Sequence, residues 1–280
     1  MLLHFEPANL TVKAMEESGL FRFRSSSLCG CYWACYQDNV NPTEMSDEVQ
    51  ENYLDPGTGI HFARAETLAG AKGMHLNDDK YFISRHKERF GLPFFVKGQP
   101  DRLWNHFSEG VYFEDTKSLD FANLYMKYKA FKNLTAKKPE LRADAEREIL
   151  PYVKQVSVYA FLYYVWHKTS ILKGQIHFID RNDPLREFAW SIDLWDPEKT
   201  QAWLEHHPAI QACLQDDPWI ASNAALEEFA NPDRFPCHWK TGQCRYFDMC
   251  PCFSHPEPAH KLTLPTLTRE DVGEFSGGPE

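Results

Sequence analysis

The sequence contains no apolar run close to the roughly 20 residues that an α-helix needs to span a bilayer. Its longest such stretch, Val158–Trp166, is too short and is rich in aromatic residues. The first ten residues include an acid and a proline, where a secretion signal has a basic start and a longer apolar core. We therefore expect a soluble, cytoplasmic protein with no membrane partner.

A surplus of positive charge is also absent. The 280 residues include 40 Asp or Glu against 30 Lys or Arg, which gives a formal net charge of −10. This balance disfavours non-specific adhesion to nucleic acid over the whole surface. A local basic track is still allowed, because salt screens such effects beyond about 10 Å at 0.1 M. The chain has no internal repeat, and its length suits one large domain or one domain with a sizeable appendage.

Cysteine is present in an uneven distribution. In an intracellular chain, eight cysteines indicate metal or redox chemistry in preference to a disulfide framework. Cys213 stands alone, and the others form an N-terminal group of Cys29, Cys31 and Cys35 and a C-terminal group of Cys237, Cys244, Cys250 and Cys252. The second group lies among turn-forming residues, and closely spaced cysteines in such a segment indicate a metal site.

The N-terminal cysteines have a simpler interpretation as well. Ser25–Ser27 would cap a helix that begins near Leu28, and Cys31 and Cys35 would then share one helical face. Free cysteines on such a face are usually small buried side chains.

Two acids and a lysine are the main chemical feature of Gly98–Lys117. Asp101 and Asp115 each end a short apolar run that is typical of a strand, and Lys117 follows two residues later. Adjacent strands would bring the two carboxylates together, where they would repel each other unless a cation lay between them. Oxygen ligands of this kind suit Mg²⁺ or Mn²⁺. Because side chains alternate along a strand, we assign Asp115 to this site rather than Glu114.

A helical region is predicted over residues 120–165, broken near Lys138-Pro139. Its first half carries five lysines among aromatic residues, which indicates either a solvated face or a phosphate track with rings for base stacking. Its second half places Gln155 and Tyr159 four residues apart on one face. Further helices are predicted over 51–91, 196–215 and 220–229, and strands over 174–180 and 187–195.

Four motifs occur in order: Gly57-x-x-x-His61, Gly98-Gln-Pro-Asp101-Arg102, Glu114-Asp115-Thr116-Lys117 and Gln155-x-x-x-Tyr159. This order resembles the RecB-like branch of the PD-(D/E)XK nucleases. That branch has a helix His, an Asp on the second core strand, Asp-x-Lys on the third strand and Gln-x-x-x-Tyr on the next helix. With the flanking cysteines, the chain is similar to iron–sulfur exonucleases such as the CRISPR-associated single-strand exonucleases, their phage relatives and the AddB-type subunits.

The resemblance implies roles for individual residues. His61, Asp101 and Asp115, with the Thr116 carbonyl, would bind Mg²⁺ or Mn²⁺, Lys117 would be the catalytic lysine, and Gln155 and Tyr159 would support the site or contact DNA. A 4Fe–4S cluster would be held by Cys31, Cys237, Cys244 and Cys250, with Cys29 and Cys35 as alternatives to Cys31. The six residues between Cys237 and Cys244 exceed the tighter spacing common in relatives, Cys252 is an extra candidate, and four thiolates also suit zinc.

These features predict an α/β fold in which a central mixed sheet is flanked by helices and both chain ends form a cysteine-rich subdomain. We expect an N-terminal segment over 1–50, a nuclease core over 51–195, C-terminal helices and the cysteine loop over 196–255, and an extended tail over 256–280. The function predicted is a metal-dependent DNA exonuclease that prefers single strands or free ends in a prokaryotic or phage-infected cell. The resemblance also allows a homo-oligomer or a recombination, repair or CRISPR-related partner.

Two alternatives remain from the sequence. One is a non-catalytic DNA-binding or adaptor protein that keeps the fold and the cluster. The other is a zinc-stabilised protein-interaction domain whose acids match the motifs by chance.

Overall fold

The structure, a computed structural model, describes residues 21–42, 74–75, 82–83, 94–98, 100–106, 110–229, 238–239, 242–243, 246 and 250. Its main sheet has the strand order β2-β5-β6-β7-β8. The strands are β2 (Met74–His75), β5 (Arg102–His106), β6 (Gly110–Leu119), β7 (Lys173–Asp180) and β8 (Glu187–Asp193). Strands β6 and β7 are parallel, and the other three pairs are antiparallel. The predicted α/β architecture with a central mixed sheet is therefore confirmed, and the predicted strands at 174–180 and 187–195 are β7 and β8.

Two smaller sheets lie outside the main one. The first has the order β1-β4-β3, from β1 (Arg22–Arg24), β4 (Phe95–Gly98) and β3 (Phe82–Ile83), and the second pairs β9 (His238–Trp239) with β10 (Gly242–Gln243). The prediction of helix over 51–91 is wrong where the structure describes this range, because β2 and β3 are strands. Two-residue strands are too short to show a periodicity in the sequence. The rest of that range lies outside the described residues.

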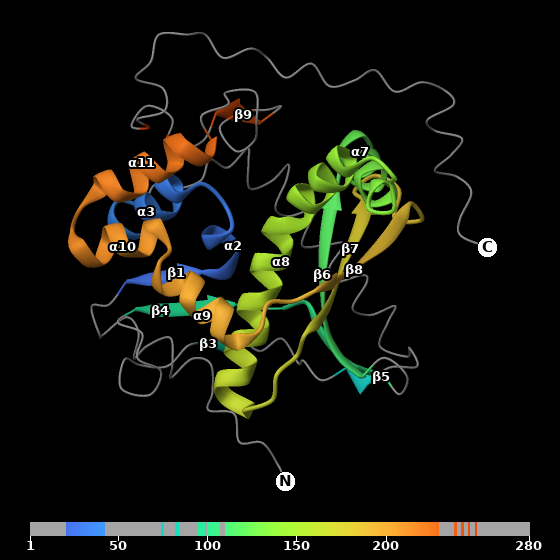
Figure 1. Cartoon of the computed structure of the whole chain (residues 1–280), viewed down its shortest axis with the longest axis horizontal. Helices are drawn as coiled ribbons and strands as arrows, with labels where there is room; N and C mark the ends of the chain where they lie inside the picture. The colour runs from blue at the N-terminus through green and yellow to red at the C-terminus, as the bar shows by residue number, and fades with distance from the viewer. Residues whose placement is uncertain are drawn as a thin grey trace.

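The parallel pair β6–β7 is connected by two helices that break where the sequence predicts. Helix α7 (Phe121–Asn133) is capped by Asp120, whose side chain accepts a hydrogen bond from the backbone N–H of Asn123. Helix α8 (Pro139–His167) begins at a proline, which is tolerated there because the first helical N–H needs no partner. Helix α8 runs between the main sheet and a group of elements that contains β1, β4 and the remaining helices (Figure 1).

The C-terminal helices repeat this use of proline. Helices α9 (Pro197–Glu205), α10 (Pro208–Gln215) and α11 (Pro218–Phe229) each begin at a proline. The helix predicted over 196–215 is therefore two helices, divided before Pro208. Proline ends a helix because it lacks an N–H and disfavours helical backbone in the residue before it.

The N-terminal helices correct one sequence prediction. Ser25–Leu28 form a short helix of their own, α2, and α3 spans Tyr32–Val40. The serines therefore do not cap the cysteine-bearing helix. Cys31 occupies the N-cap position of α3, and its carbonyl accepts the backbone N–H of Cys35 at 2.9 Å. Both cysteine side chains are buried.

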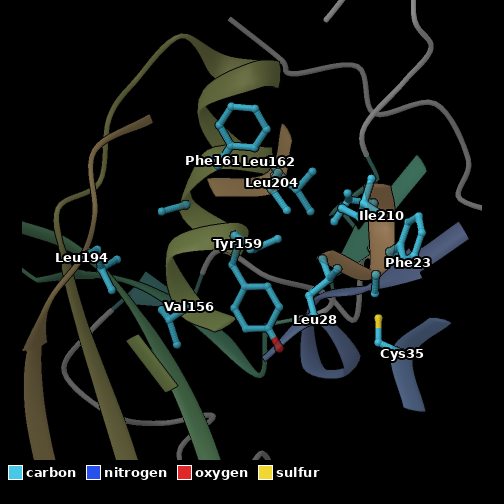
Figure 2. Packing of buried hydrophobic residues seen from close by; sticks show 14 of the residues in the cluster. Phe23, Leu28, Cys35, Val156, Tyr159, Phe161, Leu162, Leu194, Leu204 and Ile210 are labelled. Carbon is cyan, nitrogen blue, oxygen red and sulfur yellow. The ribbon is translucent and has the colours of Figure 1, made fainter. Parts of the chain in front are cut away.

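The hydrophobic core surrounds α8. Tyr159 projects from this helix, with Val156 on one side and Leu28 of α2 on the other (Figure 2). Leu204 of α9 and Ile210 of α10 belong to the same buried cluster. Helix α8 thus connects the main sheet to the N-terminal and C-terminal helices. No helix in the described part of the chain is long and apolar enough to cross a membrane.

Candidate active site

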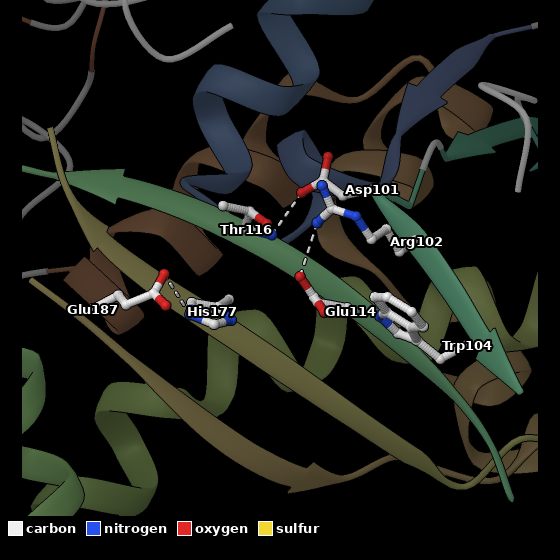
Figure 3. A network of polar contacts seen from close by, with 7 residues as sticks. All are labelled: Asp101, Arg102, Trp104, Glu114, Thr116, His177 and Glu187. Atoms are coloured by element: carbon white, nitrogen blue, oxygen red, sulfur yellow. Dashed lines mark hydrogen bonds and ion pairs between the residues drawn. The ribbon is translucent and has the colours of Figure 1, made fainter. Parts of the chain in front are cut away.

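The pairing of β5 with β6 places the first acid of the candidate site beside the second strand. Arg102 lies opposite Glu114 in this antiparallel ladder, and Asp101 directly precedes β5. The Asp101 Oδ2 atom accepts a hydrogen bond from the backbone N–H of Thr116 at 2.6 Å (Figure 3). Asp101 therefore lies against the part of β6 that carries Asp115 and Lys117. The predicted strand pair is wrong in detail: the apolar run before Asp101 forms β4 of a smaller sheet, β6 pairs with β5 instead, and Asp115 lies inside β6 rather than at its end.

Asp115 and Lys117 lie on the helix-facing side of β6, as the alternation of strand side chains predicts. Lys117 Nζ is 2.7 Å from Asp115 Oδ2, and the exposed side-chain fractions are 26% for the lysine and 4% for the acid. Partial burial lowers the pKa of Lys117, but Asp115, Tyr159 and Asp101 more than offset this and raise the pKa above its usual value. The lysine is therefore a cation at neutral pH. It is available for charge stabilisation rather than as a general base.

Glu114 faces the opposite side of the sheet and has different partners. Its Oε1 atom accepts from Arg102 Nη1 at 2.9 Å, and its Oε2 atom accepts from Trp104 Nε1 at 2.8 Å (Figure 3). The side chains of the Arg102–Glu114 pair are each 4% exposed. Glu114 thus fixes the pairing of β5 with β6 and does not join the Asp115 side.

Helix α8 brings the predicted Gln–Tyr pair to the same carboxylate. Gln155 Nε2 donates to the Tyr159 hydroxyl at 2.6 Å, and this hydroxyl lies 3.5 Å from Asp115 Oδ1, at the long end of hydrogen-bond distances. Burial and the nearby Asp115 raise the pKa of Tyr159 above its usual value. The phenol is therefore neutral and can donate its proton to a carboxylate.

A second lysine approaches the site through a shared aromatic ring. The Tyr152 ring centroid is 6.0 Å from Lys117 Nζ and 5.0 Å from Lys127 Nζ. Lys127 also pairs with Glu148. Because a cation is attracted to the face of an aromatic ring, Tyr152 connects the two lysines without a direct contact between the charges.

The aromatic residues of α7 pack in part against the sheet. Tyr125 is buried, while Tyr128 and Phe131 contact Phe188 of β8 with ring centroids 5.4 and 5.7 Å apart. Tyr128 and Phe131 are half-buried, and their role in base stacking stays a prediction. Of the basic residues on α7, Lys129 and Lys132 are exposed.

The donors near Asp101 fit a hard divalent cation by their chemistry, because they are carboxylate oxygens beside a lysine. Within the described ranges, no group of three or more His, Cys, Asp or Glu side chains is arranged to hold a metal ion. A metal bound to Asp101 and Asp115 would need further ligands, such as the Thr116 carbonyl, water or the predicted His61. His61 lies outside the described residues.

The predicted cluster ligands are only partly described. Cys31 and Cys250 are buried, whereas Cys237 and Cys244 lie outside the described residues. The Tyr246 hydroxyl donates to Asp38 Oδ1 of α3 at 2.5 Å, which joins residue 246 to the helix that follows Cys31. The predicted cluster and the choice of its ligands therefore stay predictions.

Sequence reasoning named Gly98 and Arg102 as motif positions and Ser25 as a helix cap, but gave none of them a role at the site, although all three contact the residues above. The signal for Arg102 is present in the sequence, because Arg102 and Glu114 occupy the strand positions next to the two acids. Gly98 and Ser25 gave no such signal, since their importance comes from the approach of α8, which is distant in the sequence.

No protein-family model and no curated protein matches this sequence. Solved structures to which the fold is distantly similar include the following three. SSO0001 is 14% identical with a TM-score of 0.43, over 75% of this chain and 88% of that one. An alkaline exonuclease (LHK-Exo) from Laribacter hongkongensis is 12% identical with a TM-score of 0.40, over 78% and 98% of the two chains. The same exonuclease in complex with dAMP is 14% identical with a TM-score of 0.41 over the same shares. Similarity at this level does not assign an activity, which has to be argued from the site.

Proposed function

We propose that this protein is a divalent-metal-dependent nuclease that hydrolyses DNA phosphodiester bonds. One observation carries the proposal: Asp101 accepts a hydrogen bond from the backbone N–H of Thr116, the residue between Asp115 and Lys117, and Lys117 Nζ is 2.7 Å from Asp115. Two carboxylates and a cationic lysine are the groups that a hydrolytic phosphoryl-transfer site requires. The distant similarity to a fold that includes an exonuclease agrees with this proposal without carrying it.

Each residue has a distinct task in this account. Asp101 and Asp115 would hold Mg²⁺ or Mn²⁺, which when bound supplies Lewis-acid stabilisation of the phosphate and lowers the pKa of water. Lys117 places its positive charge where negative charge develops on the phosphate oxygens or orients the attacking water. Gln155 and Tyr159 hold the Asp115 carboxylate in orientation from the helix side.

The substrate preference and the cluster extend the proposal. We infer single-stranded DNA or DNA with free ends as substrate, digested as an exonuclease. A structural 4Fe–4S cluster on Cys31, Cys237, Cys244 and Cys250 would connect the N-terminal helices to the C-terminal segment. The contact between Tyr246 and Asp38 supports such a connection. Zinc is the alternative occupant, and iron and sulfide analysis of anaerobically purified protein distinguishes the two.

The test is a cleavage assay on single-stranded DNA labelled at the 5′ or the 3′ end, with Mn²⁺ or with EDTA. We expect Mn²⁺-dependent loss of label, and the label that is lost first gives the direction of digestion. Lys117→Ala should reduce the rate about 100-fold or more, as removal of a transition-state charge does. Lys129→Ala, which removes an exposed lysine on α7, should retain most of the activity.

Folded wild-type protein that carries its full iron or zinc content and leaves DNA intact in Mn²⁺ would contradict the nuclease proposal. If such protein still bound DNA, the non-catalytic adaptor would replace it. Equal activity of wild type and Lys117→Ala would show that any cleavage arises elsewhere.

A further inference from the structure

Ser25 is the first residue of α2 and lies far from the site residues in sequence. It is 3% exposed, and a side-chain hydrogen bond joins it to the hydroxyl of Tyr159. Its own carbonyl accepts a hydrogen bond from Cys29 Sγ at 3.2 Å, which closes the turn of α2. The serine hydroxyl is thus held between the N-terminal cysteine segment and the helix that faces Asp115.

Gly98 makes the approach of these groups sterically feasible. A Cβ atom at this position would lie 2.6 Å from Tyr159 Cδ1 and 3.2 Å from Ser25 Oγ. The first distance is shorter than side chains tolerate, so the missing side chain leaves the space that the tyrosine ring occupies. Strand β4, helix α2 and helix α8 therefore converge on one phenol.

The hydrogen-bonding capacity of this phenol decides where its proton points. A tyrosine hydroxyl has one proton and can accept from neighbouring donors. The Gln155 amide Nε2 donates to it at 2.6 Å, and the Ser25 hydroxyl is its second side-chain partner besides Asp115. A serine hydroxyl can donate as well as accept. When Ser25 donates to the phenol oxygen as Gln155 does, the phenol proton is left for Asp115 Oδ1, 3.5 Å away.

We propose that Ser25 is a positioning residue of the active site: its hydroxyl orients the Tyr159 O–H toward Asp115 and so holds that carboxylate for metal binding. This inference rests on the proposed function of the same site. It also gives the N-terminal segment a role in the site besides supplying a cluster ligand. In this proposal Ser25 acts through Tyr159 and would not itself be a metal ligand.

The experiment is a double-mutant cycle between Ser25→Ala and Tyr159→Phe, measured as Mn²⁺ affinity by electron paramagnetic resonance and as kcat and KM for single-stranded DNA. Ser25→Ala should weaken Mn²⁺ binding or lower kcat about 10-fold, the size typical of outer-shell partners, with KM for DNA little changed. In the Tyr159→Phe background, Ser25→Ala should change Mn²⁺ affinity and kcat by no more than about twofold, because the Tyr159 hydroxyl that Ser25 positions is absent. Ser26→Ala is the matched control, since Ser26 is the exposed neighbour, and it should match wild type.

A second variant guards against a folding defect. Ser25→Cys keeps the side-chain size but offers only a weak donor, so it should lose affinity as Ser25→Ala does while unfolding in urea as wild type does. The inference is overturned if Ser25→Ala behaves like Ser26→Ala, or if its loss is equally large in the Tyr159→Phe background. If wild type binds Mn²⁺ but does not cleave DNA, the nuclease proposal fails. The role of Ser25 is then still decided by the Mn²⁺ affinities of the double-mutant cycle. Wild type that does neither would overturn both.

Discussion

The environment of Lys117 shows how single residues define the chemistry of this protein. Its ammonium group lies 2.7 Å from Asp115 and within electrostatic reach of Asp101, and these carboxylates raise its pKa despite partial burial. The lysine therefore contributes positive charge and hydrogen bonds rather than accepting a proton. Side chains alternate between the two faces of any strand. The sequence alone was therefore enough to predict that Asp115 and Lys117 share a face.

Gly98 provides a prediction at the same scale. Gly98→Ala would place a methyl group 2.6 Å from the Tyr159 ring, so the ring or the strand must shift. We expect a loss of about 1–3 kcal/mol in the free energy of unfolding, the usual cost of overpacking. Displacement of Tyr159 should also lower cleavage activity. Urea denaturation and the cleavage assay measure the two effects.

Gly30→Ala is the matched control for this substitution. The nearest atom to an added Cβ there is the Ser27 carbonyl oxygen at 3.6 Å, an ordinary contact. Its unfolding free energy should stay within about 0.5 kcal/mol of wild type. Equal costs for the two alanine variants would contradict the packing of Tyr159 against Gly98.

At the scale of elements, the pairing of β5 with β6 places Asp101 against the Thr116 backbone, next to Asp115. The buried Arg102–Glu114 ion pair lies on the face opposite the site and joins the two strands, with Trp104 as a second donor to Glu114. A shift of one residue in this pairing would turn each side chain to the other face. The ion pair therefore maintains the geometry of the site without belonging to it.

Breaking this pair should be costly. Glu114→Ala leaves the Arg102 guanidinium buried without its carboxylate, and we expect a loss of about 3–5 kcal/mol in unfolding free energy. The exposed pair Arg147–Asp144 is the control, with exposed side-chain fractions of 58% and 64%. Arg147→Ala should cost less than about 1 kcal/mol. Denaturant unfolding that gave Glu114→Ala the same small cost would show that the pair does not fix the two strands.

The elements that the sequence predicted correctly have strong local signals. Strands β7 and β8 are apolar runs bounded by turns. The break near Lys138-Pro139 was predictable because proline disfavours helical backbone in the residue before it. The prediction failed where such signals are weak. Strands β2 and β3 are held by pairing with distant strands, and Ser25–Leu28 form a helix only one turn long.

At the scale of the whole molecule, His207 connects the C-terminal helices to the N-terminal segment. Its Nε2 atom donates to the Leu28 carbonyl at 2.8 Å. Its ring contacts the rings of Tyr32 and Trp203 edge-on, with centroids 5.0 and 5.1 Å away. Burial lowers the pKa of His207 from 6.5 to about 4. A neutral imidazole is therefore part of the folded state, and its protonation opposes the docking of these segments.

This depressed pKa predicts a pH dependence of stability. Between pH 4 and 6.5 the unfolded chain binds a proton at His207 that the folded chain does not, so stability falls as the pH falls through this window. The contribution is fully present above pH 6.5, and its loss reaches about 3 kcal/mol at the lower end. Urea unfolding at several pH values should show a smaller slope for His207→Gln than for wild type. His206→Gln, a change at the exposed neighbour, should keep the wild-type slope, and an unchanged slope in His207→Gln would contradict this role.

Contacts between distant parts of the chain could not be predicted from the sequence. Leu28 and His207 are 179 positions apart in the sequence, and Asp38 and Tyr246 are 208 positions apart, so no local pattern indicates their contacts. The motifs of the candidate site were accessible because each is local and their order follows a known pattern. The way in which Ser25 reaches Tyr159 depends on tertiary packing alone.

The central claim is that Asp101 and Asp115 share one divalent cation, and Mn²⁺ binding tests it most directly. Electron paramagnetic resonance titrations of wild type, Asp101→Asn and Asp115→Asn compare proteins of nearly identical shape that differ in one charge. We predict one site in wild type and a loss of affinity of more than about tenfold in each variant, since even outer-shell changes can reach that size. The exposed Asp144→Asn should bind as wild type does. Wild-type affinity in both Asn variants, or no binding in wild type, would contradict the account.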